Sequence, residues 1–203
     1  MDGQHQRASR RATNALWMTL YGAGASSVIW WEGTFGWLGA VLWAVAALGL
    51  GLAGTAQLIS IRNLSGASGP SRRFDRILAR KIGAVIGTYM VAEGFSALTL
   101  HALQYDVLIF PVAVGIAGVH FWVFARVLGI WEYYVTGTLD CLVVAITLVV
   151  TTPSSMVGSI YSWVYFPLLG GGVALLVTAG MMLYESRAVV RGLNAPPNDA
   201  TAP

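Results

Sequence analysis

Charged residues are scarce in this chain: they make up 10% of its 203 residues, whereas 56% are hydrophobic. An ordinary soluble domain carries about 25% charged residues. A chain of this length can bury a core, but it has too little polar surface to cover apolar side chains on this scale. The shortage of charge therefore excludes an ordinary soluble domain and predicts an integral membrane protein.

Cysteine and lysine occur once each, as Cys141 and Lys81. A lone cysteine closes no disulfide within the chain, and thiolate metal sites need further ligands, so we interpret Cys141 as a small buried apolar side chain. Lys81 lies in a basic segment, which argues against a retinal Schiff base. There is no Gly-x-x-x-x-Gly-Lys phosphate loop, and His101 and His120 differ too much in expected depth to share a haem. We therefore expect no cofactor.

Six apolar runs follow one another along the chain, at residues 13–31, 37–61, 82–103, 107–128, 133–152 and 157–184. A helix needs about 20 apolar residues to cross a bilayer, and an unpaired strand in lipid would leave its backbone unsatisfied. The runs predict an all-α, polytopic bundle of six transmembrane helices. Residues 1–12 form a basic N-terminal segment, and we expect the tail, 185–203, to be disordered at its end. Arginines before the first run resemble a signal peptide, but the run is long enough for a retained helix.

Basic residues predict the orientation of the bundle. Every Lys and Arg falls in the segments 1–12, 62–81 and 185–203 or at the end of the fourth run, at Arg126. Basic residues concentrate on the cytoplasmic side of membrane proteins. Both termini are therefore predicted to be cytoplasmic, with the chain in a bacterial plasma membrane.

Partners are expected from the same pattern. Because the basic residues lie between apolar runs rather than on one face, we exclude nucleic acid and expect the 62–81 loop to contact anionic lipid headgroups. The second run has small residues at three- or four-residue spacing, which let helices approach closely. This stripe predicts packing within the bundle or a homo-oligomer; its members are Ala40, Ala44, Ala47, Gly51 and Thr55.

Ionisable side chains inside the apolar runs are the candidate functional residues, because such groups are costly in a membrane. Glu93, His120 and Asp140 lie well inside three different runs. Asp140 also belongs to a polar stripe on the fifth run. Successive residues of a helix are about 100° apart around its axis, so the spacing of the stripe residues brings them to one face. That face is predicted to point at protein or water; its residues are Tyr133, Thr136, Asp140, Thr147 and Thr151.

Two further features extend this cluster. Tyr89 lies one turn before Glu93 in a weaker polar stripe on the third run. His120 and Asp140 are equally far in sequence from residue 130, so a tight turn there places them at the same depth, about 15 Å along each helix. We expect the two side chains to pair across the seam between the fourth and fifth runs.

The cluster has two interpretations, which the sequence leaves open. In the first, Glu93, His120 and Asp140, with Tyr89, Thr136 and Thr147, bind a proton or a polar or cationic substrate in a small secondary transporter. In the second, they form interhelical hydrogen bonds in a non-catalytic scaffold or partner subunit; such bonds contribute about 0.6 kcal/mol on average. An intramembrane enzyme is less well supported, because no nucleophile–base pair or metal-ligand set is evident.

One segment, residues 118–137, resembles part of uncharacterised small bacterial multi-span membrane proteins. The resemblance rests on Gly118-Val119-His120-Phe121, on Ala125-Arg126 and on Tyr133-Tyr134-Val135-Thr136-Gly137. Those proteins have no assigned activity. The resemblance therefore implies a shared multi-span fold and carries no site residue over to this chain.

Overall fold

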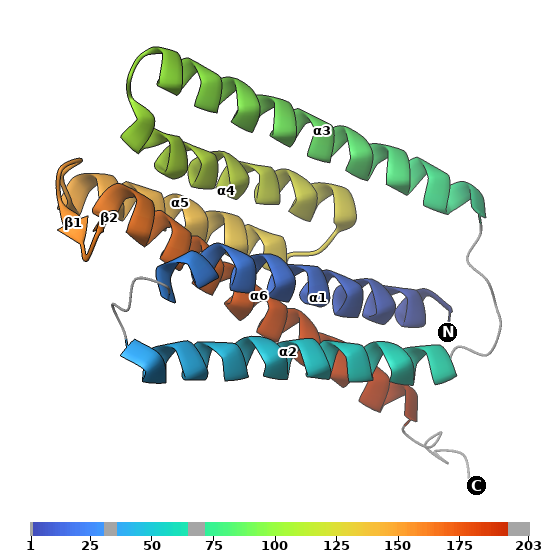
Figure 1. The fold of residues 1–203 in the computed structure, drawn as a ribbon. Coiled ribbons are helices and arrows are strands. Elements are labelled where there is room, and N and C mark those ends of the chain that lie inside the picture. Colours follow the sequence, from blue (N-terminus) through green and yellow to red (C-terminus); the bar gives the residue numbers. More distant parts are fainter. Residues whose placement is uncertain (1, 31–35, 65–71, 195–203) are drawn as a thin grey trace, which may run out of the picture.

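The computed structural model describes residues 2–30, 36–64 and 72–194, and within them the chain is all-α, with six helices and one short hairpin (Figure 1). The hairpin pairs β1 with β2 in antiparallel register. In chain order the elements are α1 (Asp2–Trp30), α2 (Gly36–Leu64), α3 (Arg72–Ala102), the 3-10 helix η1 (Asp106–Leu108), α4 (Ile109–Leu128), α5 (Glu132–Val150), β1 (Met156–Val157), β2 (Ile160–Tyr161) and α6 (Ser162–Asn194).

Four of these helices contain stretches long and apolar enough to cross a membrane. The stretches are Arg80–Ala102, Asp106–Leu128, Glu132–Val150 and Ser162–Ala188, and the described part of α2 adds a shorter one, Ala44–Ser60. A span needs about 20 residues of mainly apolar helix. The chain is therefore a multi-pass membrane protein with four candidate spans among the described residues.

The helix ends differ from the predicted runs in two ways. First, helix continues beyond the apolar runs at the basic end of the bundle: α1 begins at Asp2, α2 ends at Leu64, α3 begins at Arg72 and α6 ends at Asn194. Polar residues in water sustain a helix that packing has already nucleated, so helix covers residues 62–64 and 72–81 of the predicted loop and residues 185–194 of the predicted tail. The predicted disorder at the end of the tail lies outside the described residues. Second, the predicted helical start at 157–161 is wrong, because Gly158 takes a left-handed φ of 65° and turns the chain into the hairpin.

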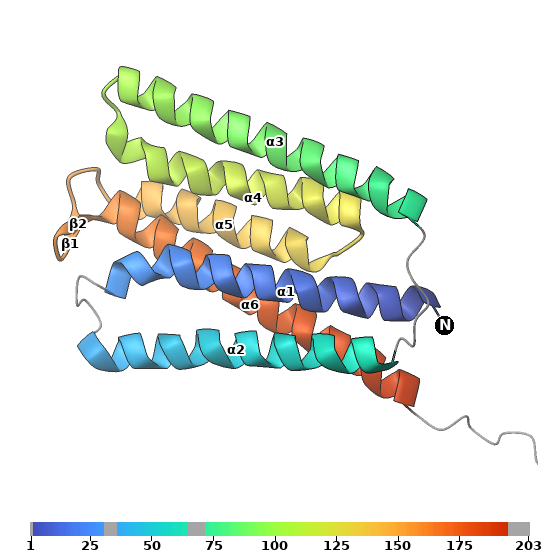
Figure 2. The same cartoon turned by 45° about the vertical axis from the view of Figure 1, so that its right-hand side comes forward.

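The helices run alternately up and down (Figures 1 and 2). The start of α1, the end of α2, the start of α3, the α4–α5 turn and the end of α6 lie at one end, which we call the basic end. The α3–α4 connection and the hairpin lie at the other end. This arrangement agrees with the segregation of Lys and Arg in the sequence.

The helix α6 organises the packing, since it contacts α1, α5, α2 and α4, whereas the described contacts of α3 are with α4 and η1. In both views α6 crosses the bundle obliquely, from the hairpin towards α2. The hydrophobic core lies towards the basic end, where α1, α6 and the α4–α5 turn meet; it comprises Ala15, Met18, Ala125, Ile130, Tyr133, Ala179, Met182 and Leu183.

Polarity is distributed inside-out compared with a soluble bundle. The buried residues of α5 are Glu132, Tyr133, Thr136, Gly137, Asp140 and Thr147. Its outward residues include Val149 and Val150, which are 85% and 74% exposed. On α3, Val91, Phe95 and Leu98 are each more than 70% exposed. Apolar side chains outside and polar side chains inside are what a helix surrounded by lipid requires.

A glycine forms the tight connection between α4 and α5. Gly129 ends α4 in the left-handed conformation, φ 67°, and its N–H donates to the carbonyl of Ala125. Glycine adopts this conformation without the steric cost that a Cβ brings. The turn makes α4 and α5 antiparallel neighbours, as the sequence predicted.

Candidate functional site

The polar face of α5 points into the bundle, as predicted from its spacing. The side chains of Thr136, Asp140 and Thr147 are buried, and Thr136 Oγ1 lies 2.6 Å from Thr178 Oγ1 in α6. Thr147 Oγ1 donates to the carbonyl of Val143 one turn earlier. The threonines are thus satisfied, by a partner helix or by their own backbone, and Asp140 is the ionisable member of the face.

Asp140 lies where α4, α5 and α6 meet. A Cβ placed on Gly118 of α4 would lie 3.2 Å from Asp140 Cβ, and one placed on Gly171 of α6 would lie 3.6 Å from Asp140 Oδ1. Asp140 is 2% exposed, and in the part of the chain that the structure describes its Oδ1 has no hydrogen bond partner. Buried polar atoms are nearly always hydrogen bonded. An unsatisfied carboxylate oxygen in this position therefore needs a reason other than the packing of the bundle.

His120 lies in a different place from the one expected. Its ring packs against Tyr89 of α3, with centroids 4.7 Å apart, and against Phe124, with centroids 4.4 Å apart. The predicted pairing of His120 with Asp140 is wrong: no ion pair joins them among the described residues. The equal depth was correct, since Gly118 packs on Asp140. However, His120 is two residues beyond Gly118, about 200° around the helix, and so faces α3.

A pocket of about 330 Å³ lies between α3, α4 and α6. Tyr89, Glu93 and Ser96, one turn apart on α3, form its polar side. The rest of the lining is apolar and comprises Ala97, Ile109, Phe110, Ala113, Val114, Ala117 and Leu168. The pocket therefore offers one carboxylate and two hydroxyl groups in an otherwise apolar surround.

Asp140 is not part of the lining of this pocket, but it lies close to one of the lining residues. Val114 lines the pocket, and a Cβ on Gly171 would lie 3.6 Å from both Val114 Cγ1 and Asp140 Oδ1. The structure thus divides the predicted cluster into Tyr89, Glu93 and His120 on the α3–α4 seam and Asp140 with its threonines on α5. Among the described residues, no three His, Cys, Asp or Glu side chains group closely enough to hold a metal ion.

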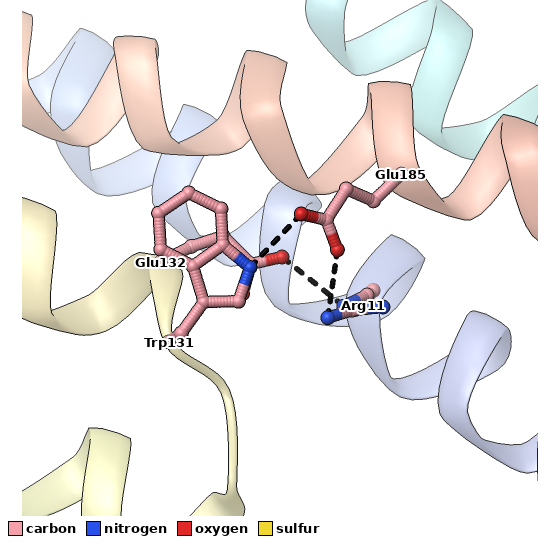
Figure 3. Close-up of polar contacts among 4 residues, drawn as sticks. All are labelled: Arg11, Trp131, Glu132 and Glu185. Carbon is pink, nitrogen blue, oxygen red and sulfur yellow. Dashed lines mark hydrogen bonds and ion pairs between the residues drawn. The ribbon is translucent and has the colours of Figure 1, made fainter.

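The structure also contains an ion-pair cluster that sequence reasoning missed, at the basic end (Figure 3). Arg11 of α1 extends between two carboxylates, with Nε 3.1 Å from Glu132 Oε1 and a terminal nitrogen 2.7 Å from Glu185 Oε2. The indole N–H of Trp131 donates to Glu185 Oε1 at 2.9 Å. The three charged residues come from α1, α5 and α6, so no local spacing in the sequence could reveal the cluster.

Glu132 is the unusual member of this cluster. Its side chain is fully buried, and neither of its oxygens has a hydrogen bond of good geometry to a described residue, although Arg11 is at ion-pair distance. Removing one partner of such a pair leaves an uncompensated buried charge. The sequence offered one signal for this residue, namely that it is an acidic residue beside Trp131 at the start of an apolar run.

Comparisons with known proteins add no relative: no protein-family model, no curated protein and no solved structure matches the chain. The expected likeness to small bacterial multi-span proteins stays a prediction.

Proposed function

We propose that the chain is a small secondary transporter or permease-like protein of the bacterial plasma membrane, which binds a proton or a polar or cationic substrate within its bundle. The observation that carries this proposal is the buried carboxylate of Asp140, whose Oδ1 has no hydrogen bond partner within the described ranges of the chain. Ionisable groups inside a membrane bundle are costly and mark ion and substrate pathways. A purely structural carboxylate is expected to have its oxygens hydrogen bonded or, as for Glu132, to be paired with a cation.

The pocket between α3, α4 and α6 supports a binding role for the second carboxylate. Glu93 and Tyr89 line it together with apolar side chains, a composition typical of small-molecule sites. His120 is the next group along the seam, through its ring contact with Tyr89. In this proposal Glu93 receives the substrate or proton, and Asp140, which like Val114 lies close to Gly171, is the second carboxylate of the pathway.

The topology in this proposal is six spans with both termini cytoplasmic. The supporting feature is the alternation of the helices, which brings every basic segment to one end (Figure 1). The exposed side chains of Arg80 and Lys81 at that end are suited to anionic headgroups, as proposed for the 62–81 region.

Proton-coupled flux in vesicles tests the transport proposal. We expect the purified protein to move protons or a cationic substrate, and Asp140→Asn and Glu93→Gln each to reduce the rate at least about tenfold. The matched control is Asp106→Asn, which changes an exposed carboxylate at the opposite end from the basic segments. Equal rates for all four proteins at every pH would remove both carboxylates from the mechanism.

A scaffold or partner subunit is the second candidate. Ala44 and Thr55 of α2 are exposed, and a Cβ on Gly51 would meet nothing within 4 Å. The small-residue stripe of α2 is thus exposed at Ala44 and Thr55 and part-exposed at Ala47 and Gly51, which suits a homo-oligomer. Replacing Gly51 with Leu and measuring the mass of the complex in detergent distinguishes a single copy from an oligomer.

A further inference from the structure

A second pocket, of about 550 Å³, adjoins the ion-pair cluster at the basic end. It lies along α6 beside the residue that precedes α5, and it is lined by Trp131, Val177, Gly180, Met181, Tyr184 and Glu185. None of these residues belongs to the transport site proposed above. The pocket therefore requires its own explanation.

The polar end of this pocket is suited to a positive charge. Glu132 and Glu185 both contact the single guanidinium of Arg11. Among the described residues each carboxylate oxygen of Glu185 has one partner, and it can accept a second donor. The rings of Trp131 and Tyr184 lie in the same lining and are 47% and 77% exposed. A carboxylate beside exposed aromatic rings favours an ammonium group, through charge and cation–π attraction.

The apolar end of the pocket runs along one face of α6. Val177, Gly180, Met181 and Tyr184 have the spacing of a single helical stripe, and Val177 is about 10 Å from Tyr184 along the axis. The stripe leads from Glu185, near the end of the candidate span Ser162–Ala188, into that span. A Cβ on Gly180 would meet only Leu50 Cδ2, at 4.0 Å, so its place in the stripe is open.

We propose that this pocket binds a membrane lipid whose headgroup carries an ammonium ion. The ammonium group lies against Glu185 and Trp131, and an acyl chain follows the stripe past Gly180 towards Val177. Trp and Tyr concentrate at the level of lipid headgroups, which agrees with the depth of Trp131 and Tyr184 at the ends of their spans.

Native mass spectrometry of the full chain in detergent tests this proposal, with phosphatidylethanolamine and phosphatidylglycerol of identical acyl chains as probes. We expect phosphatidylethanolamine to bind about tenfold more tightly, because only its headgroup donates charged hydrogen bonds. Gly180→Leu, which fills the stripe without touching the ion pairs, should weaken the binding of both lipids, because it blocks the path of the acyl chain that they share. Glu185→Gln should reduce the preference for phosphatidylethanolamine about tenfold, provided that the variant stays folded.

The control variant is Gly83→Leu, the same change at a position of α3 where a Cβ meets nothing within 4 Å. It should leave the binding of both lipids, and the preference for phosphatidylethanolamine, unchanged. Equal binding of the two lipids by the original protein, or binding of phosphatidylethanolamine that Gly180→Leu leaves unchanged, would overturn the proposal. Displacement of the lipid by free ethanolamine at equal concentration would show a site for the amine alone and would contradict a lipid ligand.

Discussion

Gly118 of α4 and Gly137 of α5 bring the backbones of the two helices into direct contact. A Cβ on Gly118 would lie 2.9 Å from the carbonyl oxygen of Gly137, and a Cβ on Gly137 would overlap the carbonyl oxygen of Gly118. Small residues permit such close approach between membrane helices. This crossing also brings Asp140 against α4, so the packing of two glycines determines where the buried carboxylate lies.

Gly137→Ala should therefore destabilise the protein by about 1–3 kcal/mol, the usual cost of overpacking. Gly115→Ala, in α4, is the matched control, because a Cβ at Gly115 meets nothing within 4 Å. It should stabilise the helix by about 0.5–1 kcal/mol, since alanine loses less backbone entropy than glycine. Thermal unfolding in detergent measures both changes. Equal effects of the two variants would contradict the close crossing.

Arg11→Ala should destabilise the protein by about 3–5 kcal/mol, because it leaves the fully buried Glu132 without its cation. Lys81→Ala, at an exposed basic position, should change stability by less than about 0.5 kcal/mol. Adding Glu132→Gln to Arg11→Ala should restore part of the loss, because no buried charge then remains. Failure of the double variant to regain stability would mean that Arg11 acts through packing alone.

Asp140→Asn should leave the free energy of unfolding within about 1 kcal/mol of that of the unchanged protein. The substitution keeps the size of the side chain, and it removes the charge of a carboxylate whose Oδ1 has no hydrogen bond partner among the described residues. Asp140→Leu should cost about 1–3 kcal/mol by overpacking against Gly118 and Gly171. A large loss of stability in the Asn variant would indicate a structural role for the carboxylate.

His120→Phe should preserve stability, because the ring contacts of His120 with Tyr89 and Phe124 need an aromatic side chain rather than a charge. His120→Ala should cost about 1–3 kcal/mol through lost packing. Vesicle flux of His120→Phe then separates the roles: full flux assigns His120 to packing, and lost flux with an intact fold assigns it to the proposed pathway.

Cysteine labelling tests the topology, in a background in which Cys141→Ser removes the native thiol. A membrane-impermeant reagent added outside intact cells should label Ser155→Cys, next to the hairpin, and should not label Ser68→Cys. Labelling of Ser68→Cys from outside would contradict the predicted orientation and support the reverse one.

Particular residues show how far the sequence predicts the structure. The spacing of Thr136, Asp140 and Thr147 along α5 correctly predicted a buried polar face, because helical periodicity is a local property. Equal spacing from residue 130 correctly predicted that Asp140 lies near the depth of His120. The same spacing could not predict which way His120 points, since that depends on the rotation of α4 against two neighbours at once.

The sequence by itself determined the class of this protein: an all-α bundle of apolar helices, with the basic residues at one end and one carboxylate midway along each of two apolar runs. Those features follow from amino-acid composition and from helical periodicity, which are properties of each segment on its own. Only the tertiary structure decided that Asp140 meets Gly118 and Gly171, that His120 joins Tyr89, and that Arg11 holds Glu132 and Glu185. These contacts join residues far apart in the chain. They are selected by packing between helices, which depends on the shapes of the side chains rather than on the helical periodicity of one segment.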